Sequence, residues 1–329
     1  MSKNIVMVGA GVANVNAATK LIDKGYNGKI TIIDMGKNPY DRKYSEVMEG
    51  FLGAGGWSDG KLTYHTSIGG QLSKYVGEEK AMELFDQVIN NFKRFHPNPS
   101  EVQCSNPTAE PDFIKPYFGL RLFPVWHVGT DYLHEIGKNW YDFLVDGGVN
   151  FEWEAKVTSI DFENQTGTVI VPQSGRTHSF EYDKLIFGVG KSGIDFGKKL
   201  AEQYGLPTEP KPVQIGVRFE APQKHFQKLI DVSYDFKLYR KFENEGVSLK
   251  YIEDFIEDMK KVFPTLGDDW GVYVPEIKYL SPEPLVNYSD LSLTKYPNVH
   301  FVGDALSARG ITVSGAQGTL VAEQLIKNK

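Results

Sequence analysis

The segment "NIVMVGAGVANVNAATKLIDKGYNGKITIID", residues 4–34, decides which fold class this chain belongs to. Its apolar start, Asn4–Val8, is typical of a buried parallel strand, and the glycine-rich stretch "GAGVAN" follows directly. A helical pattern comes next, and a second apolar strand, Lys29–Ile33, ends at Asp34. Strand, glycine loop, helix, strand and acid in this order form the dinucleotide-binding fingerprint. We therefore expect a Rossmann-like α/β domain, the alternative being a glycine-rich turn without a ligand.

Each part of the fingerprint predicts a contact with the dinucleotide. Gly9 permits the tight turn, and Gly11 lets the backbone approach a pyrophosphate. The pyrophosphate would lie against the N–H groups where the helix begins, at Val12 and Ala13. Asp34 would accept hydrogen bonds from the adenosine ribose hydroxyls, and an acid at this position disfavours NADP.

One position of the fingerprint departs from the usual pattern. Asn14 stands where the third glycine would allow the helix and the strand to pack closely. We expect its side chain either to push the helix slightly outward or to point toward the ligand.

The composition of the chain limits its domain number and the classes of ligand and partner that it can bind. A chain of 329 residues with a net charge of -6 suggests about two domains and gives no electrostatic footprint for nucleic acid. Cys104 is the only cysteine, which excludes an intramolecular disulfide and a cysteine-built zinc site, and no other residue spacing predicts a metal. No segment reaches the roughly 18 apolar residues of a membrane span, and the first residues lack a secretory leader. We expect a soluble cytoplasmic protein.

The next distinctive stretch, "GFLGAGGWSDGKLTYH" at residues 50–65, favours FAD over NAD. Five glycines in its first eleven residues leave the backbone able to wrap a bulky ligand. The alternative is a surface loop without function. Trp57 argues against it, because an indole is unusual in a flexible loop exposed to solvent. The residues that we expect to line the cofactor here are Gly55, Gly56, Trp57, Ser58 and Lys61, with Asp59 as a further polar group.

The middle of the chain predicts the antiparallel meander of flavin-binding domains. Four short alternating segments between residues 149 and 183 are separated by turns, and Val157 in this region is expected at the cofactor. An apolar strand, Lys184–Phe187, then leads into "GVGKSG", where Gly188 and Gly190 would line the same ligand. A second, nicotinamide site at this turn stays open as an alternative, although prolines interrupt the segment that follows.

The stretch "NVHFVGDALSARGIT", residues 298–312, completes the predicted site. Its strand should run beside the first strand of the chain, so that Gly303 and Asp304 face the cofactor and the carboxylate bonds a ribityl hydroxyl. The helix that begins near Ile311 and Thr312 would aim its N–H groups at the flavin N1 and O2 edge. A plain strand-ending turn is the alternative for this stretch.

These patterns divide the chain into two parts. We expect a discontinuous FAD-binding domain of residues 1–75, 120–195 and 285–329, and a mixed α/β substrate domain of residues 76–119 and 196–284. Helical periodicity covers Glu78–Phe95 and Ser248–Phe263. Strand-like segments between residues 212 and 284 would form a cap over the flavin.

The candidate catalytic residues are Lys61, His127, Arg218 and Arg309, with His65 and Tyr273 as weaker candidates. Lys61 could stabilise negative charge on the flavin or anchor its loop. For Arg218 the alternatives are an anionic substrate group and a structural ion pair. His127 lies among apolar neighbours and is either a base or a buried core histidine.

Together these segments resemble the uncharacterised FAD-dependent dehydrogenases of the two-dinucleotide-binding flavoprotein superfamily, which have a glutathione-reductase-like FAD domain. The matching pieces are "VMVGAGVANVNAATKLIDKGY", "GAGGWSDGKLT", "HVGTDYLHEIGKNW", "KPVQIGVRFEAPQ" and "VGDALSARGITVSGAQG". The chain would be a short member of this family. The resemblance implies FAD bound at the Gly9 loop, Asp34, the loop of residues 55–61 and the Asp304 turn, and it implies no particular substrate.

The leading hypothesis is an FAD-dependent oxidoreductase that takes a hydride from a small polar substrate, amine or amino-acid-like, at a C–N or C–C bond. A second hypothesis is an FAD-dependent C–N bond cleaving enzyme that acts on an amino-acid adduct, including one on a modified nucleobase. A third is a flavin-binding protein without catalysis. The electron acceptor and the oligomeric state stay open.

Overall fold

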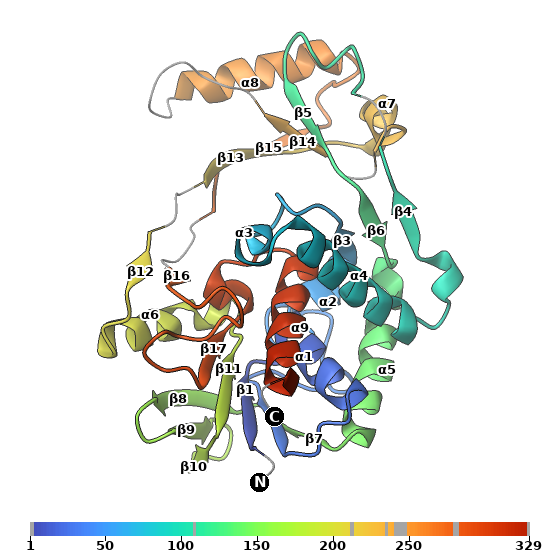
Figure 1. Cartoon of the computed structure of the whole chain (residues 1–329). Helices are drawn as coiled ribbons and strands as arrows, with labels where there is room; N and C mark the ends of the chain where they lie inside the picture. Colours follow the sequence, from blue (N-terminus) through green and yellow to red (C-terminus); the bar gives the residue numbers. More distant parts are fainter. Residues whose placement is uncertain are drawn as a thin grey trace. The chain divides into compact units, whose positions relative to one another are not determined.

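The computed structural model describes residues 3–107, 110–210, 214–233, 236–239, 249–278 and 283–327. These residues divide into two compact units, which are traced in Figure 1. Unit 1 contains Met1–Gln103, Trp126–Lys211 and Ser281–Lys329, and unit 2 contains Cys104–Val125 and Pro212–Leu280. Each unit has its own hydrophobic core.

A five-stranded parallel sheet is the centre of unit 1. β1 (Ile5–Val8) pairs with β2 (Ile30–Ile33) on one side and with β11 (Lys184–Phe187) on the other. β7 (Val149–Glu152) extends the sheet beyond β2, and β17 (Val299–Phe301) extends it beyond β11. Because the strands are parallel, their carboxyl ends lie at one edge, where ligands bind in open α/β sheets.

The last strand is not where we expected it. β17 pairs with β11, so β11 separates β17 from β1. The reason is that β2 and β11 already occupy both edges of β1. The following turn still reaches the first helix, since a Cβ built at Gly303 would lie 3.7 Å from the Ala13 Cβ.

Three long helices of unit 1 pack together, as Figure 1 shows: α1 (Val12–Asp23), α4 (Glu78–Phe95) and α9 (Ile311–Lys327). α4 has the predicted bounds, and its apolar face is buried. Because that face packs against α9, residues 76–103 belong to unit 1 rather than to the second domain that we expected.

The antiparallel meander is present as a three-stranded sheet of β8 (Lys156–Asp161), β9 (Thr166–Val171) and β10 (Arg176–Glu181). A second small sheet has the order β3 (Lys61–Thr63), β6 (Val125–His127) and β4 (Gln103–Ser105), and the last two strands cross the unit boundary. The other strands and α-helices of unit 1 are α2 (Gly55–Ser58), α3 (Leu72–Val76), α5 (Leu133–Asp146), α6 (Ile194–Gln203), β12 (Thr208–Glu209) and β16 (Glu283–Pro284).

The described part of unit 2 contains two antiparallel strand pairs and two α-helices. β13 (Gln214–Glu220) pairs with β15 (Gly271–Lys278), and β5 (Gly119–Leu122) pairs with β14 (Phe236–Tyr239). The helices are α7 (Gln227–Ile230) and α8 (Leu249–Val262). The described core residues of this unit are Ile114, Phe118, Leu229, Met259, Val262 and Phe263.

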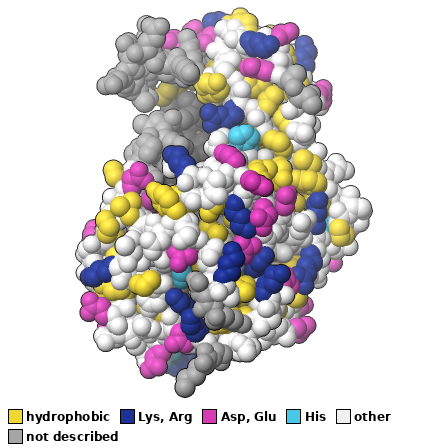
Figure 2. Space-filling model, viewed as in Figure 1, with side chains coloured by type: hydrophobic (Ala, Val, Ile, Leu, Met, Phe, Trp, Pro, Cys, Tyr) yellow, Lys and Arg dark blue, Asp and Glu magenta, His cyan; other side chains and the backbone are white. Residues whose placement is uncertain are grey.

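The surface carries charges of both signs. Figure 2 shows basic and acidic side chains interspersed on the viewed face, and ion pairs join Lys20 and Lys80 to Glu323 in the region of α1, α4 and α9. Among the described helices, none is long and apolar enough to cross a membrane. The described residues also contain no cluster of three metal-ligating side chains.

Candidate functional site

The glycine loop after β1 has a backbone conformation that requires glycine. Gly9 has a φ of +95°, and a Cβ there would lie 2.6 Å from the Gly188 carbonyl oxygen, so only glycine fits. A Cβ at Gly11 would meet only the Gly188 oxygen, at 3.8 Å. The backbone at the start of α1 is therefore accessible to a bulky group such as a diphosphate.

The side chain of Asn14 points back toward the end of β1. Its Nδ2 donates to the carbonyl oxygens of Val8 and Gly9, at 3.0 and 2.7 Å. Gly188 makes room for it, since a Cβ at Gly188 would lie within 3 Å of the Asn14 side chain. Asn14 therefore occupies the space that a third glycine would leave empty, and it ties the first turn of α1 to the end of β1.

Asp34, at the end of β2, accepts three backbone hydrogen bonds. Its Oδ2 accepts from Ala10 N at 2.7 Å, and its Oδ1 accepts from Gly36 N and Gly50 N at 2.7 and 2.9 Å. Burial raises the pKa of Asp34, although these N–H groups and the charge of Arg42 act in the opposite direction. The carboxylate therefore joins the two loops that we predicted to hold the dinucleotide.

Arg42 is the main organising residue that sequence reasoning missed. Its guanidinium is buried and donates to the carbonyl oxygens of Glu46, Val47, Phe51 and Gly53, at 2.7 to 3.2 Å. Burial lowers its pKa to about 10, so it stays charged at neutral pH. A lone arginine in an irregular loop has no periodicity or motif that would have revealed this role.

The glycine-rich loop lies against both the first glycine loop and α9. Leu52 N donates to Ala10 O at 2.8 Å, and Leu52 forms a parallel bridge with Gly11. A Cβ at Gly55 would lie 2.6 Å from Ile311 Cγ1, at the start of α9. The predicted residues of three distant segments thus meet in unit 1.

Trp57 is buried inside this loop. Its ring stacks on His134 with centroids 3.6 Å apart, and the Arg42 guanidinium lies 4.4 Å from its centre. Its Nε1 donates to the Lys43 carbonyl oxygen at 3.2 Å. The indole therefore stabilises the loop, and its predicted contact with a cofactor stays untested. Of Ser58 only the backbone position is described.

The start of α9 combines a buried hydroxyl with a positioned turn. Thr312 is buried, and within the described residues its Oγ1 has no hydrogen-bond partner. Gln317, one helical turn and a half further on, accepts from Gly303 N at 2.7 Å and so holds the turn that carries Asp304. A Cβ at Gly190 would lie 3.9 Å from Asp304 Oδ2. Sequence reasoning missed Gln317, although a buried polar residue on an apolar helix face is a usable signal.

Asp304 is partly buried, and two cations act on it electrostatically. Burial raises its pKa, whereas the charges of Arg309 and Lys191 act to lower it. Arg309 N donates to the Gly69 carbonyl oxygen at 2.7 Å, which fixes the backbone just before α9.

Val157 lies in the meander, close to the strand that ends at Asp34. Ala155 N, two residues earlier, donates to Asp34 O at 2.9 Å. Val157 itself is buried and pairs with Val169. Val157 therefore follows, by two residues, a backbone contact with Asp34, which we predicted to bind the adenosine ribose.

Two predicted catalytic residues, Lys61 and His127, come together with Asp59. Lys61 begins β3, His127 ends β6, and these strands are neighbours in one sheet. Lys61 Nζ lies 3.8 Å from Asp59 Oδ1. Burial lowers the pKa of His127, Lys61 acts in the same direction, and Asp59 acts to raise it.

The other catalytic candidates lie elsewhere or outside the described side chains. Arg218 pairs with Tyr273 across β13 and β15 in unit 2, where only the backbone is described. His65 is exposed, and its Nδ1 accepts from Ser67 N at 3.2 Å. The structure thus brings Lys61 and His127 together and leaves Arg218 in the other unit.

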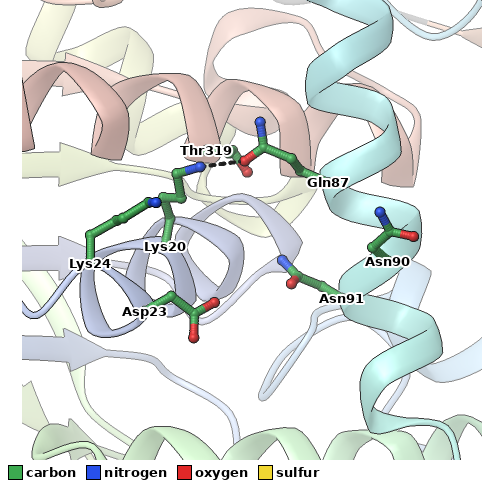
Figure 3. A pocket seen from close by; sticks show the side chains of 7 residues that line it. All are labelled: Lys20, Asp23, Lys24, Gln87, Asn90, Asn91 and Thr319. Atoms are coloured by element: carbon green, nitrogen blue, oxygen red, sulfur yellow. Dashed lines mark hydrogen bonds between the residues drawn. The ribbon is translucent and has the colours of Figure 1, made fainter.

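A cavity of about 260 Å³ lies away from all these residues, at the opposite end of α1 from the glycine loop. Figure 3 shows that side chains of α1, α4 and α9 line it. All are polar: Lys20, Asp23, Lys24, Gln87, Asn90, Asn91 and Thr319. None of them belongs to the predicted site.

The fold, but not the sequence, matches known proteins. No protein-family model matches the chain, and no curated protein matches it in sequence. Similar solved structures are a flavoprotein/dehydrogenase from Cytophaga hutchinsonii, a glycine oxidase from Geobacillus kaustophilus and the E. coli quinol fumarate reductase. Their TM-scores are 0.52, 0.53 and 0.57, with 16, 12 and 12% identity. Each match covers 99% of this chain, and 79, 95 and 70% of the respective relative.

At these identities the likeness establishes the fold. The chain has the α/β architecture with a parallel sheet and an antiparallel meander that is found in this Rossmann-like flavoprotein group.

Proposed function

We propose that this protein is an FAD-dependent oxidoreductase that takes a hydride from a small polar substrate, amine or amino-acid-like. The observation that carries the proposal is the meeting of three segments at the carboxyl ends of the strands. The Gly9 loop contacts the glycine-rich loop, which in turn contacts the start of α9. The likeness to a structure titled flavoprotein/dehydrogenase and to a glycine oxidase supports it.

Two features fit a dinucleotide cofactor such as FAD. The accessible backbone over Gly11 suits a diphosphate, and the buried Thr312 hydroxyl supplies a polar group for an isoalloxazine edge at a helix N-terminus. When bound, FAD would supply a hydride acceptor at its N5 atom. The residues that we propose to hold it are Gly9, Gly11, Val12, Ala13, Asn14, Asp34, Gly55, Gly56, Trp57, Ser58, Lys61, Val157, Gly188, Gly190, Gly303, Asp304, Ile311 and Thr312.

Within this proposal the protein's own groups have separate tasks. Asp304 would accept a hydrogen bond from a ribityl hydroxyl, and Asp34 would accept one from the adenosine ribose. Lys61, His127 and Arg309 would orient the substrate and manage its proton. The polypeptide mainly excludes water and holds the donor carbon in place.

The absorption spectrum of the purified protein tests the proposal directly. We expect a yellow protein, or one that becomes yellow on incubation with FAD, whose flavin absorbance is bleached anaerobically by at least one compound in a panel of amines and amino acids. A colourless protein that stays empty with FAD would sink the proposal. Bound flavin that no panel compound reduces would favour a non-catalytic flavin protein instead.

Asp304 offers a sharper test of the cofactor position. Replacing it by alanine removes a partly buried acceptor, so we expect Asp304→Ala to weaken FAD binding about tenfold or more. Asp304→Asn, which keeps an acceptor oxygen, should bind FAD more tightly than the alanine variant. The control is Asp195→Ala on α6, where the side chain is 91% exposed. Equal FAD affinities for Asp304→Ala and the control would contradict the assignment.

A further inference from the structure

Unit 2 contains a hydroxyl, an imidazole and a carboxylate in series, and none of these groups belongs to the proposed flavin site. His225 Nδ1 lies 3.0 Å from Thr265 Oγ1, and His225 Nε2 lies 3.0 and 3.1 Å from the two carboxylate oxygens of Asp269. The His225 side chain is only 5% exposed, whereas Thr265 is exposed at the surface. A buried imidazole is therefore hydrogen-bonded to a hydroxyl that a ligand can reach.

Aromatic packing holds the segments that carry these three groups. Phe226, which follows the histidine, packs edge-on against Phe263, with ring centroids 4.9 Å apart. Phe263 is buried in the core of unit 2 and lies two residues before Thr265. Trp270, which follows the aspartate, stacks on Phe219 with centroids 5.0 Å apart. Because packed neighbours restrict the backbone on both sides, the three groups are held in position before any reaction.

The carboxylate fixes which nitrogen of the neutral imidazole carries the proton. Hydrogen bonds from His225 and Lys224 lower the pKa of Asp269, so its carboxylate is ionised at neutral pH and can only accept. His225 Nε2 must then carry the N–H, and the lone pair of the neutral ring is at Nδ1. The Thr265 hydroxyl therefore donates to Nδ1. A hydroxyl that donates to a base, with the base oriented by a third group, is the arrangement of an activated nucleophile.

We propose that Thr265 is a nucleophile that accepts an acyl group from an activated acyl ester, with His225 as its base and Asp269 as the positioning residue. Thr265 Oγ1 forms a bond to the carbonyl carbon of the ester, and the bond between that carbon and the leaving oxygen breaks. The hydroxyl proton passes to His225 Nδ1 and then to the leaving oxygen, so the step needs no oxidant or reductant.

The order of the three groups matches that used in acyl transfer. Relative to the Ser-His-Asp triad the two ring nitrogens are exchanged, since there Nε2 contacts the hydroxyl and Nδ1 the carboxylate. The proton transfer requires only that one ring nitrogen accepts and the other donates, which His225 satisfies. The step goes beyond the proposed flavin chemistry and does not depend on it.

The probe is p-nitrophenyl acetate, and mass spectrometry of peptides from the treated full chain locates the acetyl groups. We expect Thr265 to be acetylated about a hundredfold or more faster than Thr208, an exposed threonine on β12. Hydroxylamine should remove the ester at Thr265 and leave the amides formed at lysines. Thr265→Ser should still be acetylated at this position, Thr265→Val should lose the product, and the matched control Thr208→Val should keep it. A rate at Thr265 no greater than that at Thr208 would overturn the proposal.

Two further variants separate proton transfer from a structural role. His225→Gln keeps an amide that can bond the Thr265 hydroxyl but cannot take its proton, so we expect acetylation about a hundredfold slower. In ¹⁵N NMR on histidine-labelled protein, the neutral ring of His225 should have its N–H at Nε2. The amide in Asp269→Asn can donate to Nε2, so this variant should shift the proton to Nδ1 and slow acetylation about tenfold or more.

Each of these measurements has an outcome that refutes the assignment. Unchanged acetylation of Thr265 in His225→Gln would show that the imidazole is not the base. A neutral His225 ring with its proton at Nδ1 in the unaltered protein would show that the hydroxyl cannot donate to it. Because no measurement uses the flavin, a failure to bind FAD would leave these results as they stand.

Discussion

Asn14 shows how one side chain can replace the glycine of a well-known motif. In the usual fingerprint, glycine at this position removes a side chain so that helix and strand approach closely. Here the amide of Asn14 fills the gap and donates to Val8 O and Gly9 O, while Gly188 provides the space. Asn14 in one segment is thus accommodated by Gly188 in another, and only the folded structure shows that these two residues are neighbours.

We predict that restoring the usual motif is harmful. Asn14→Gly would lose one buried and one partly buried hydrogen bond and put glycine inside a helix, costing together about 2 to 3 kcal/mol of unfolding free energy. FAD affinity should fall with it, because the Gly9 carbonyl is no longer held. Urea unfolding and FAD titration measure both effects, with Asn14→Ala as the variant that lacks the glycine penalty. A more stable Asn14→Gly protein would show that the amide has no such role.

At the scale of elements, the contact between α1 and α9 brings the two halves of the site together. A Cβ built at Gly318 in α9 would lie 1.8 Å from the Ala13 carbonyl oxygen, so the two helix backbones are nearly in contact. The same packing places the start of α9 beside Gly55. Strand and helix bounds such as α4 followed from periodicity, but no periodicity within either helix predicts this contact.

The α1–α9 contact makes Gly318→Ala a severe substitution. The added methyl group would overlap backbone, which cannot be relieved by a side-chain rotation, so we expect a loss of about 3 kcal/mol of unfolding free energy. Gly197→Ala in α6 is the control, because its methyl group would approach Phe187 no closer than 3.4 Å. Chemical denaturation should find the control close to the unaltered protein. Similar stabilities for both variants would contradict the close helix packing.

At the scale of the whole molecule, a buried histidine and a partly buried glutamate make the unfolding free energy depend on pH. His300 on β17 is buried and its pKa is lowered to about 4 by burial. Lys80, Lys20 and Gln87 hydrogen-bond Glu323 and, against the effect of burial, lower its pKa to about 2. Neither residue belongs to the proposed site, so their effect is on folding.

The direction in which each group changes the unfolding free energy depends on whether the folded or the unfolded protein binds the proton more tightly. Unfolded His300 titrates near 6.5, so its contribution is complete above that pH and is lost as the pH falls toward 4. Glu323 contributes above about pH 4.5 and loses its contribution as the pH falls toward 2. We predict that unfolding free energy falls by about 3 kcal/mol between pH 6.5 and 4 through His300 alone. His300→Asn should flatten this part of the urea-unfolding profile; an unchanged slope would contradict the assignment.

The sequence by itself determined the fold class and most of the elements. Apolar strands, the glycine loop and the acid at residue 34 are local patterns, because backbone geometry restricts which residues can occupy them. The fold likeness to flavoprotein structures confirms that α/β prediction. The proposed contacts of individual residues with FAD stay predictions.

Only the tertiary structure decided which segments meet. It placed β11 between β1 and β17, assigned α4 to unit 1, and brought Asp59, Lys61 and His127 together. It also revealed Arg42 and Gln317, whose partners are backbone groups that any sequence contains. The physical reason is that strand pairing and helix packing depend on surfaces from segments far apart in the chain. Periodicity and spacing within one segment do not predict which of these surfaces meet.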